Sequence, residues 1–456
     1  MKLSTALRVR KTPTLAIAGA GGKTSTMLCL AVELESAHRS VLCSSTTHFG
    51  FWQVQAQDSV LQFSDEEMPA LPAELPDGIV FITGDAHGSD RLRGLNEVQI
   101  TRLHQIAVER QMPLLIEADG ARQRALKAPA EHEPAIPAWV DQVVLCAGLS
   151  GLGKPLTGET VHRPEHFSRL TGLAQGETIT PEGLSRMLAH PQGGLKNIPP
   201  TARRSLLLNQ VDTEALQAQA YQIARQVQQA FHSVIIAALP RLGDQAMTID
   251  QIRHASPVIH AVHEPVAGIV LAAGGATRYG ELKQVVVWND HPLVWYSAQA
   301  ALAAGLSPVI VVTGAGAERV SAALSGLPVR MVHNPDWEAG QSTSLQAGLR
   351  ALPATVGGAV FLLADQPNGS AGLIQALVEA HCRSLAPIVA PLIDGQRGNP
   401  VLFDQTTFAD LMRIRGDQGG RSLFSRTPVE FIPWHDRSAL LDIDEPGDLA
   451  KLDLER

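Results

Sequence analysis

The chain has 456 residues, more than one hydrophobic core usually needs, so we expect two or three domains. A net charge of −8 with only 18% charged residues argues against a surface that coats nucleic acid, and an anionic ligand must therefore meet a few placed cations. The four cysteines lie far apart without a CxxC pair, which predicts reduced, buried thiols in a cytoplasmic protein and no zinc site. No segment approaches the roughly 20 apolar residues of a membrane-spanning helix.

The first predicted element is an apolar strand that leads into the sequence GAGGKTS and then a helix. Ile17 stands where a full Walker A motif has its first glycine, but the shorter pattern GxxGKTS is intact. We expect backbone amides of this loop to surround the phosphates of ATP or GTP, Lys23 to reach the β- and γ-phosphates, and Thr24 to meet a magnesium ion. The simpler alternative is a helix cap with an incidental lysine. The predicted nucleotide-binding residues are Gly19, Gly21, Gly22, Lys23, Thr24 and Ser25.

Further along, the strand in PLLIEADGA ends in two carboxylates that resemble a Walker B arrangement. Asp119 is the expected metal partner and Glu117 the expected base that activates water. Arg122, Arg124 and Lys127 follow directly, and they either hold an anionic substrate or line a solvated loop. The later sequence LLLNQVD is similar to the base-reading NKxD element of GTPases, but a glutamine replaces the lysine, and a simple turn is an equal alternative.

Together, GAGGKTS, the threonines before His48, EADGARQRALKAP, EHEPAIP and NQVD resemble the YqeC-like family. The resemblance covers about residues 10–240. The family is associated with the maturation of selenium-dependent molybdenum hydroxylases, so the resemblance implies a nucleotide-dependent accessory role toward a client hydroxylase.

The boundary between two domains is expected after a long amphipathic helix and one more strand. Residues 253–266 contain two prolines and three histidines without a sustained period, so we interpret them as a linker. The histidines lack the spacing of a metal site. The expected division is an N-terminal P-loop-like α/β domain at 1–252 and a second nucleotide-binding α/β domain at 267–456.

The second domain starts with another apolar strand and a glycine turn, IVLAAGGATRYGELK. The glycines let backbone amides approach a polyphosphate, and Arg278 and Lys283 supply positive charge. The expected backbone ligands of the nucleotide are Leu271, Ala272, Ala273, Gly274 and Gly275.

Strands and helices then alternate, which predicts a largely parallel sheet with helices on both faces and a ligand site at the carboxyl ends of its strands. Asp365 stands at such a strand end, and Asp442 and Asp444 share one face of a second acidic strand, LLDIDEPGDL. One or two carboxylates with phosphate oxygens and water are the ligands that Mg²⁺ prefers. The alternatives are a turn aspartate and a helix cap.

Three polar, glycine-rich loops complete the predicted cleft. GQSTS places Ser344 near a helix N-terminus that can hold an anion, unless its hydroxyls only cap the helix. The loops RGNP and GDQGGR are expected to face a second anionic substrate, although each alone is compatible with an ordinary turn. The residues concerned are Gly398, Asn399, Asp417 and Arg421.

In this order and spacing, LAAGGATRYGELKQ, NPDWEAGQSTSL, LLADQP, RGNPVLF, GDQGGR and LDIDEPGDL resemble the molybdenum cofactor cytidylyltransferase (MocA-like) branch of the nucleotidyltransferases. The resemblance covers about residues 267–453 and implies a Rossmann-like α/β/α domain. It also implies Mg²⁺-dependent transfer of CMP from CTP to molybdopterin, with Arg278 and Lys283 balancing the leaving pyrophosphate. Guanylyl transfer to the same cofactor, and a carrier or insertion chaperone that does not turn over, remain the alternatives.

Overall fold

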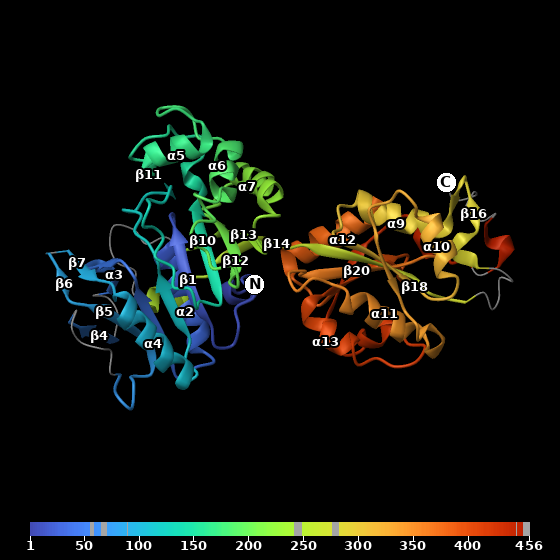
Figure 1. The fold of residues 1–456 in the computed structure, drawn as a ribbon, viewed down its shortest axis with the longest axis horizontal. Coiled ribbons are helices and arrows are strands. Elements are labelled where there is room, and N and C mark those ends of the chain that lie inside the picture. Colours follow the sequence, from blue (N-terminus) through green and yellow to red (C-terminus); the bar gives the residue numbers. More distant parts are fainter. Residues whose placement is uncertain are drawn as a thin grey trace. The chain divides into compact units, whose positions relative to one another are not determined.

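The structure is a computed structural model that describes residues 1–54, 59–64, 71–88, 90–240, 249–275, 282–443 and 445–449. It divides into two compact units, Met1–His263 and Glu264–Arg456 (Figure 1). Within the described ranges, no helix is both long and apolar enough to cross a membrane. The expectation of two α/β domains is confirmed.

Unit 1 is built on a nine-stranded sheet with the strand order β14-β13-β12-β10-β1-β8-β2-β5-β4. Its described strands are parallel except for β14 at one edge. Strand β1 lies in the middle and is buried, so the glycine loop that follows it leaves from the centre of the sheet. The strands are β1 (Thr14–Gly19), β2 (Ser40–Ser45), β4 (Ser59–Phe63), β5 (Gly78–Gly84), β8 (Leu114–Glu117), β10 (Gln142–Gly148), β12 (Arg203–Asn209), β13 (Ser233–Ala238) and β14 (Val258–His263).

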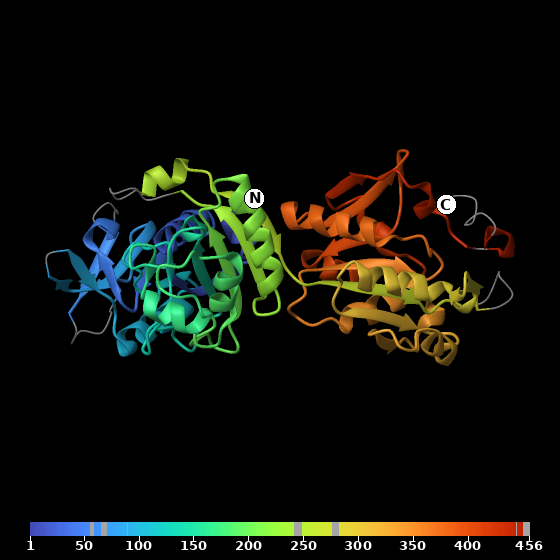
Figure 2. The ribbon, with the colours of Figure 1, turned by 90° about the horizontal axis from the view of Figure 1, so that it is seen from above.

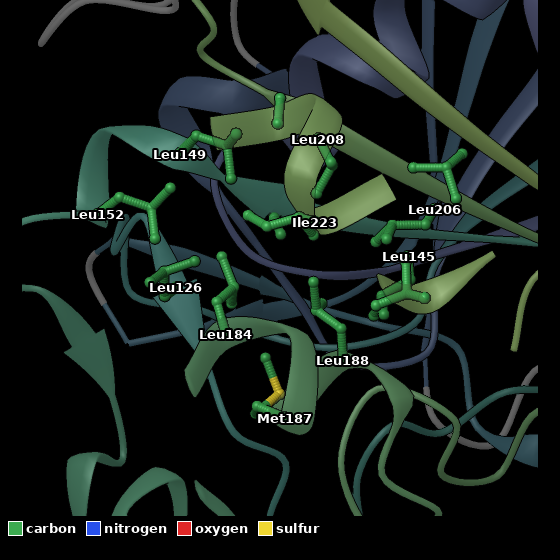
Figure 3. Close-up of a cluster of buried hydrophobic side chains, with 14 of the residues drawn as sticks. Leu126, Leu145, Leu149, Leu152, Leu184, Met187, Leu188, Leu206, Leu208 and Ile223 are labelled. Carbon is green, nitrogen blue, oxygen red and sulfur yellow. The ribbon is translucent and has the colours of Figure 1, made fainter. Parts of the chain in front are cut away.

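The helices of unit 1 cover the sheet because the apolar residues of its parallel strands point to both faces. Leu145 of β10 and Leu206 of β12 pack against Leu188 and Ile223 from two helices, α6 and α7 (Figure 3). Helix α2 packs on β1, β2 and β8. The helices are α1 (Leu3–Ala6), α2 (Lys23–Glu35), α3 (Phe51–Val54), α4 (Glu97–Glu109), α5 (Pro164–Thr171), α6 (Pro181–Ala189), α7 (Glu214–Val227) and α8 (Ile249–His254).

Two small sheets flank the main one in unit 1. One has three antiparallel strands, β3 (His48–Gly50), β7 (Arg91–Arg93) and β6 (Ala86–His87). The other pairs β9 (Leu126–Lys127) with β11 (Val161–His162). Both lie next in sequence to the motifs after β2 and β8, so they frame the carboxyl ends of these strands.

The segment 253–266, expected to be an irregular linker, is largely regular. Helix α8 ends at His254, β14 pairs antiparallel with β13, and β15 begins at Val266. The prolines bracket the strand at its two ends and so do not interrupt its ladder. The chain passes from β14 to β15 through Glu264 and Pro265 alone (Figure 2).

Unit 2 contains an eight-stranded mixed sheet with the order β19-β18-β15-β20-β23-β21-β22, and β24 pairs with β21. The four strands from β19 to β20 are parallel, as expected, whereas β23 runs antiparallel to both of its neighbours. The strands are β15 (Val266–Ala272), β18 (Val309–Thr313), β19 (Arg330–His333), β20 (Gly358–Leu363), β21 (Ile388–Ile393), β22 (Gln396–Arg397), β23 (Val401–Asp404) and β24 (Val429–Pro433), with a hairpin of β16 (Val287–Trp288) and β17 (His291–Pro292) beside them.

Helices cover both faces of this sheet. Figure 1 shows α9, α10 and α12 on one side of β18 and β20, and α11 and α13 on the other. Two separate apolar clusters fill the two interfaces, with Val270 in one and Ile269 in the other. The helices are α9 (Leu293–Ala303), α10 (Ala317–Ala323), α11 (Gln341–Arg350), α12 (Ala371–Ser384) and α13 (Phe408–Leu411).

All four cysteines are buried free thiols, as predicted. Burial raises the pKa of Cys29, Cys146 and Cys382 to about 12, and it raises that of Cys43 further. At neutral pH these side chains therefore behave as small apolar groups.

Candidate functional site

The glycine loop of unit 1 joins β1 directly to α2, as the sequence predicts. Gly19, Gly21 and Gly22 have φ angles of +93°, +78° and +134°, which side chains rarely tolerate. A Cβ on Gly21 would lie 2.4 Å from the Cα of Gly148 in β10, a backbone atom. The loop is therefore held against the neighbouring strand, and only glycine fits there.

Lys23 lies inside this loop and is 6% exposed. Its Nζ donates to the carbonyl of Gly19 at 3.0 Å and lies 3.5 Å from Asp119 Oδ1 and 3.8 Å from Glu117 Oε1. Burial lowers the pKa of Lys23, but the two carboxylates outweigh burial and the net direction is upward. The ammonium therefore stays charged where a phosphate chain would pass.

Beside the lysine, Thr24 and Glu117 place a hydroxyl and a carboxylate side by side. Thr24 Oγ1 donates to Glu117 Oε2 at 3.2 Å, and Gln53 Nε2 donates to Thr24 Oγ1 at 2.5 Å. Burial raises the pKa of Glu117, and Lys23 opposes this shift. Mg²⁺ prefers oxygen ligands, so this hydroxyl and this carboxylate could bind it together with phosphate oxygens and water. No sequence motif points to Gln53.

Asp119 is engaged differently from its expected role as metal partner. Both of its carboxylate oxygens accept the amide of Gly19 at 3.1 Å, and Lys127 Nζ lies 2.9 Å from Oδ2. Asp119 therefore anchors the glycine loop, and the metal and base roles of Asp119 and Glu117 stay predictions. Ser25 is buried in the first turn of α2.

Lys127 neither faces a substrate nor lines a solvated loop. It also contacts Glu133 at 2.8 Å, and Arg163 donates to both oxygens of Glu133 at 2.5 and 3.1 Å. Burial alone would raise the pKa of Glu133, but hydrogen bonds from Arg163 and Lys127 lower it to about 2. We call this series of ion pairs the buried ionic chain; in order, it consists of Lys23, Asp119, Lys127, Glu133 and Arg163.

The NQVD element supports the glycine loop. Asn209 Nδ2 donates to the carbonyl of Gly21 at 2.8 Å, and its Oδ1 accepts the amide of Leu239 at 2.9 Å. Gln210 has a φ of +64° and accepts a hydrogen bond from Ser150. Both amide atoms of Asn209 are therefore occupied by backbone, which favours a bracing role over the reading of a base.

The glycine loop opens into a large cleft of about 1200 Å³. Its lining includes the loop itself, Thr46 to His48 after β2, and the segment 120–124 after β8. Two hydrogen bonds hold the segment that contains the threonines before His48. Thr46 Oγ1 donates to the carbonyl of Ala135, and Thr47 N donates to Ser45 Oγ. The carboxyl ends of β1, β2 and β8 therefore form one site.

In unit 2, Asp365 and Lys283 meet at the carboxyl ends of β15 and β20. Lys283 Nζ lies 2.5 Å from Asp365 Oδ2, and the two side chains are 23% and 21% exposed. Ala364 N donates to the carbonyl of Leu271 at 3.2 Å, which joins the two strand ends. The paired cation and carboxylate are thus open to a ligand at the edge where ligands bind in such sheets.

The second acidic element reaches the same place without forming a strand. Residues 441–443 are irregular, and Ile443 N donates to the carbonyl of Asp365 at 3.2 Å. Gln366 Nε2 donates to Asp442 Oδ1, so this exposed carboxylate is held by the residue that follows Asp365. Asp444 lies outside the described residues. Among the residues that the structure describes, no three His, Cys, Asp or Glu side chains form a metal-binding group. Two carboxylates that leave other positions to phosphate and water suit Mg²⁺.

The glycine turn after β15 is described as far as Gly275, and Arg278 lies outside the described residues. Gly275 packs on Trp337, whose ring would lie 2.9 Å from an added Cβ, while Ala272 and Ala273 are buried. Gln284 Nε2 donates to the carbonyl of Gly274 at 2.7 Å. This buried glutamine and Trp337 fix the turn, and neither role was predicted from the sequence.

The polar loops converge on the N-terminus of α11. Ser344, in the first turn of α11, is buried and accepts a hydrogen bond from Asn334 Nδ2 at 3.0 Å, so it ties the loop after β19 to this helix. Asp417 Oδ1 accepts the amide of Gln341 at 3.4 Å, which brings the GDQGGR loop to the same helix end.

The RGNP loop approaches GDQGGR from the other side. The Arg397 guanidinium stacks 4.2 Å above the ring of Phe424, just beyond Arg421, and Gly398 N donates to the carbonyl of Pro391. Asn399 precedes a cis proline. Four predicted loops are therefore neighbours in this unit.

Comparison with known proteins agrees with this division. The family model "YqeC protein" matches residues 15–165, and the model "MobA-like NTP transferase domain" matches residues 268–431. YqeC of Escherichia coli (strain K12) is 35% identical over 206 residues, which are 44% of this chain and 78% of that protein. The chain belongs to the YqeC family. Its second unit is a MobA-like nucleotidyltransferase domain related to the molybdenum cofactor cytidylyltransferases, so the prediction of a nucleotidyltransferase is confirmed.

Two further relatives match the MobA-like domain. Nicotine blue oxidoreductase of Paenarthrobacter nicotinovorans is 29% identical over 197 residues, which are 41% of this chain and 96% of that protein. The crystal structure of Rv0371c from Mycobacterium tuberculosis H37Rv is 27% identical, with a TM-score of 0.37 over 41% of this chain and 98% of that one. In the YqeC-family chain, this domain follows the glycine-loop unit.

Proposed function

We propose that the MobA-like domain is a molybdenum cofactor cytidylyltransferase. It transfers CMP from CTP to the terminal phosphate of molybdopterin and releases pyrophosphate, with Mg²⁺ as cofactor. The observation that carries the proposal is the Lys283–Asp365 pair at the ends of β15 and β20, with Asp442 bonded to Gln366, the residue after Asp365.

The chemistry needs no protein nucleophile. An oxygen of the pterin phosphate attacks the α-phosphorus of CTP, and the bond from the α-phosphorus to the bridging oxygen of pyrophosphate breaks. Lys283 neutralises the leaving pyrophosphate, while the glycine turn and the N-terminus of α11 position phosphate oxygens. Asp365 and Asp442 would hold Mg²⁺, which supplies charge neutralisation when bound.

The choice of CTP is supported by six motifs in register with the cytidylyltransferase branch. The direct test measures pyrophosphate release by the purified chain with a molybdopterin-bearing acceptor and either CTP or GTP. We expect release with CTP, and release with GTP alone would replace the proposal by guanylyl transfer.

Asp365→Asn tests the metal role in the same assay. We expect a loss of kcat of about 10²-fold or more, since removal of one electrostatic group from such a site costs this much. Asp410→Asn, on α13, is the matched control and should keep full activity. Equal turnover by both variants would refute the role of Asp365, and bound CTP without turnover in the wild type would favour a carrier.

We also propose that unit 1 binds ATP or GTP with Mg²⁺ through its glycine loop. The burial of Lys23 inside the loop, next to Thr24 and Glu117, favours this second function. Lys23→Ala should abolish nucleotide binding, whereas Lys154→Ala, an exposed lysine, should not. Hydrolysis measured on both variants then tells whether the bound nucleotide turns over.

The two activities together are proposed to serve the maturation of a client molybdenum hydroxylase. In cells, Lys23→Ala and Asp365→Asn should each lower hydroxylase activity without lowering the amount of hydroxylase protein. Normal hydroxylase activity with Lys23→Ala would separate unit 1 from this role.

A further inference from the structure

The cleft of unit 1 has more space than one nucleotide needs. Pockets for single small ligands usually enclose about 300–1000 Å³, whereas this cleft encloses about 1200 Å³. The glycine loop occupies only one part of its wall. The rest of the wall is therefore available to a second ligand.

That remaining wall is positively charged, although the chain as a whole is acidic. Apart from Lys23 and Glu117 at the glycine loop, five arginines line the cleft against Asp90 and Glu133, and the five are Arg91, Arg93, Arg122, Arg124 and Arg163. Glu117 and Glu133 are already paired with Lys23 and Arg163, and Asp90 lies 3.8 Å from Arg91. The cleft thus retains an excess of positive charge.

Arg122 and Arg124 are the centre of this excess. Arg122 is exposed, Arg124 is half-buried, and in the described part of the chain neither forms an ion pair with a carboxylate. The pKa of His162 in the same wall falls to about 4, because burial and the cations Arg163, Lys127 and Arg122 outweigh Glu133. His162 is therefore uncharged at neutral pH, and the arginines carry the positive charge of this wall.

The backbone holds the two arginines in place. Arg122 and Gln123 have φ angles of +47° and +58°, a left-handed conformation that is strained for residues other than glycine and that clusters at ligand sites. The segment is anchored before the turn by Asp119 and after it by Lys127, two members of the buried ionic chain. Arg124 N also donates to the carbonyl of Ala121 at 3.0 Å. A fixed turn thus presents to the cleft two guanidinium groups that have no carboxylate partner among the described residues.

We propose that Arg122 and Arg124 bind a second substrate of unit 1, a small molecule that carries a phosphate group, beside the nucleotide on the glycine loop. Paired guanidinium groups match the oxygens of a phosphate better than a single ammonium does. The proposal rests on the proposed nucleotide site of unit 1 and assigns to it the class of its second ligand.

The test uses the full chain and inorganic phosphate as the probe. Phosphate is titrated calorimetrically into protein saturated with a non-hydrolysable ATP analogue and Mg²⁺. We expect Arg122→Ala/Arg124→Ala to weaken phosphate binding about tenfold or more, as expected for charged hydrogen bonds, with nucleotide affinity unchanged. Any binding to unit 2 is common to both proteins, so the difference between them isolates the cleft of unit 1.

The control is Arg102→Ala/Arg169→Ala, which removes two exposed arginines outside the cleft lining and should bind phosphate like the wild type. Equal phosphate binding by the cleft variant and this control would overturn the proposal. So would complete displacement of phosphate by the nucleotide analogue, because the arginines would then serve the nucleotide itself. Acetate binding as tight as phosphate binding would overturn the assignment to a phosphate group.

Failure of the nucleotide site gives a different result. In that case wild type and Lys23→Ala show the same nucleotide binding. Phosphate is then titrated into Lys23→Ala without nucleotide, with and without the two arginine changes. A loss caused by the arginine changes supports the second site, and no loss overturns it.

Discussion

The two glycine loops of this chain place a lysine next to an aspartate in different surroundings. Lys23 is 6% exposed and faces two carboxylates at 3.5 and 3.8 Å, as the first member of the buried ionic chain. Lys283 is 23% exposed and faces one described carboxylate, Asp365, at 2.5 Å. In unit 1, contacts within the folded protein therefore fix the lysine of the glycine loop without any ligand. In unit 2, the Lys283–Asp365 pair is partly solvated.

The largest expected difference between the two loops is the loss of unfolding free energy when a glycine is replaced by alanine. Gly21→Ala forces a Cβ to within 2.4 Å of the Gly148 backbone at a φ of +78°, and strain and overpacking together cost about 3–5 kcal/mol. Gly274→Ala meets only the end of the Gln284 side chain, at 3.4 Å, and should cost less than about 1 kcal/mol. Urea unfolding followed by circular dichroism measures both, and equal losses would show that the loops are equally constrained.

The next effect compares the lysines by activity. Lys23→Met should remove nucleotide binding by unit 1 and leave cytidylyl transfer intact, whereas Lys283→Met should do the reverse. Each loss is expected to be about 10²–10³-fold, the cost of removing one group that stabilises phosphate charge. Both assays are run on both variants. A lysine change that impairs both activities would show that the two sites are coupled.

The smallest effect concerns acid stability. The pKa of Glu133 lies at about 2 in the folded chain, below its ordinary value of 4.5. Its pairing thus stabilises unit 1 above pH 4.5, and this contribution, at most about 3 kcal/mol, is lost as the pH falls from 4.5 to 2.

Glu133→Gln should therefore make the free energy of unfolding of unit 1 less sensitive to pH in this window. Glu165→Gln, an exposed glutamate of α5, is the control and should keep the sensitivity of the wild type. Urea titrations at pH 7 and pH 3 provide the comparison. The same acid sensitivity in both variants would contradict the assigned role of the buried ionic chain.

Local sequence signals predicted much of each site. An apolar run followed by glycines located both loops, and Asp365 was recognised because it directly follows a buried strand. The same reasoning predicts that ligand-binding motifs meet at strand ends, and the structure pairs Asp365 with Lys283 there and bonds Asp442 to Gln366. Arg278 and Asp444 stay predictions.

Contacts between distant segments were not predictable in this way. Gln53 bonds Thr24 across 29 positions and Asn209 bonds Gly21 across 188, and neither belongs to a local pattern that fixes its partner. The sequence predicts that Lys127 holds a substrate or lines a solvated loop, because it does not show that Glu133 and Asp119 enclose this side chain. The prolines and the lack of a period predict a linker where β14 lies. The prolines stand only at the ends of this strand, and its pairing with β13 is not visible in the sequence.

The buried thiols give each unit an internal reporter. Cys29, Cys43 and Cys146 belong to unit 1 and Cys382 to unit 2, and burial keeps all four protonated at neutral pH. Since the thiolate is the reactive form, alkylating reagents should modify a cysteine only when its own unit opens. Mass spectrometry of alkylated peptides would then measure the opening of the two units separately in one sample, without any substitution in the chain.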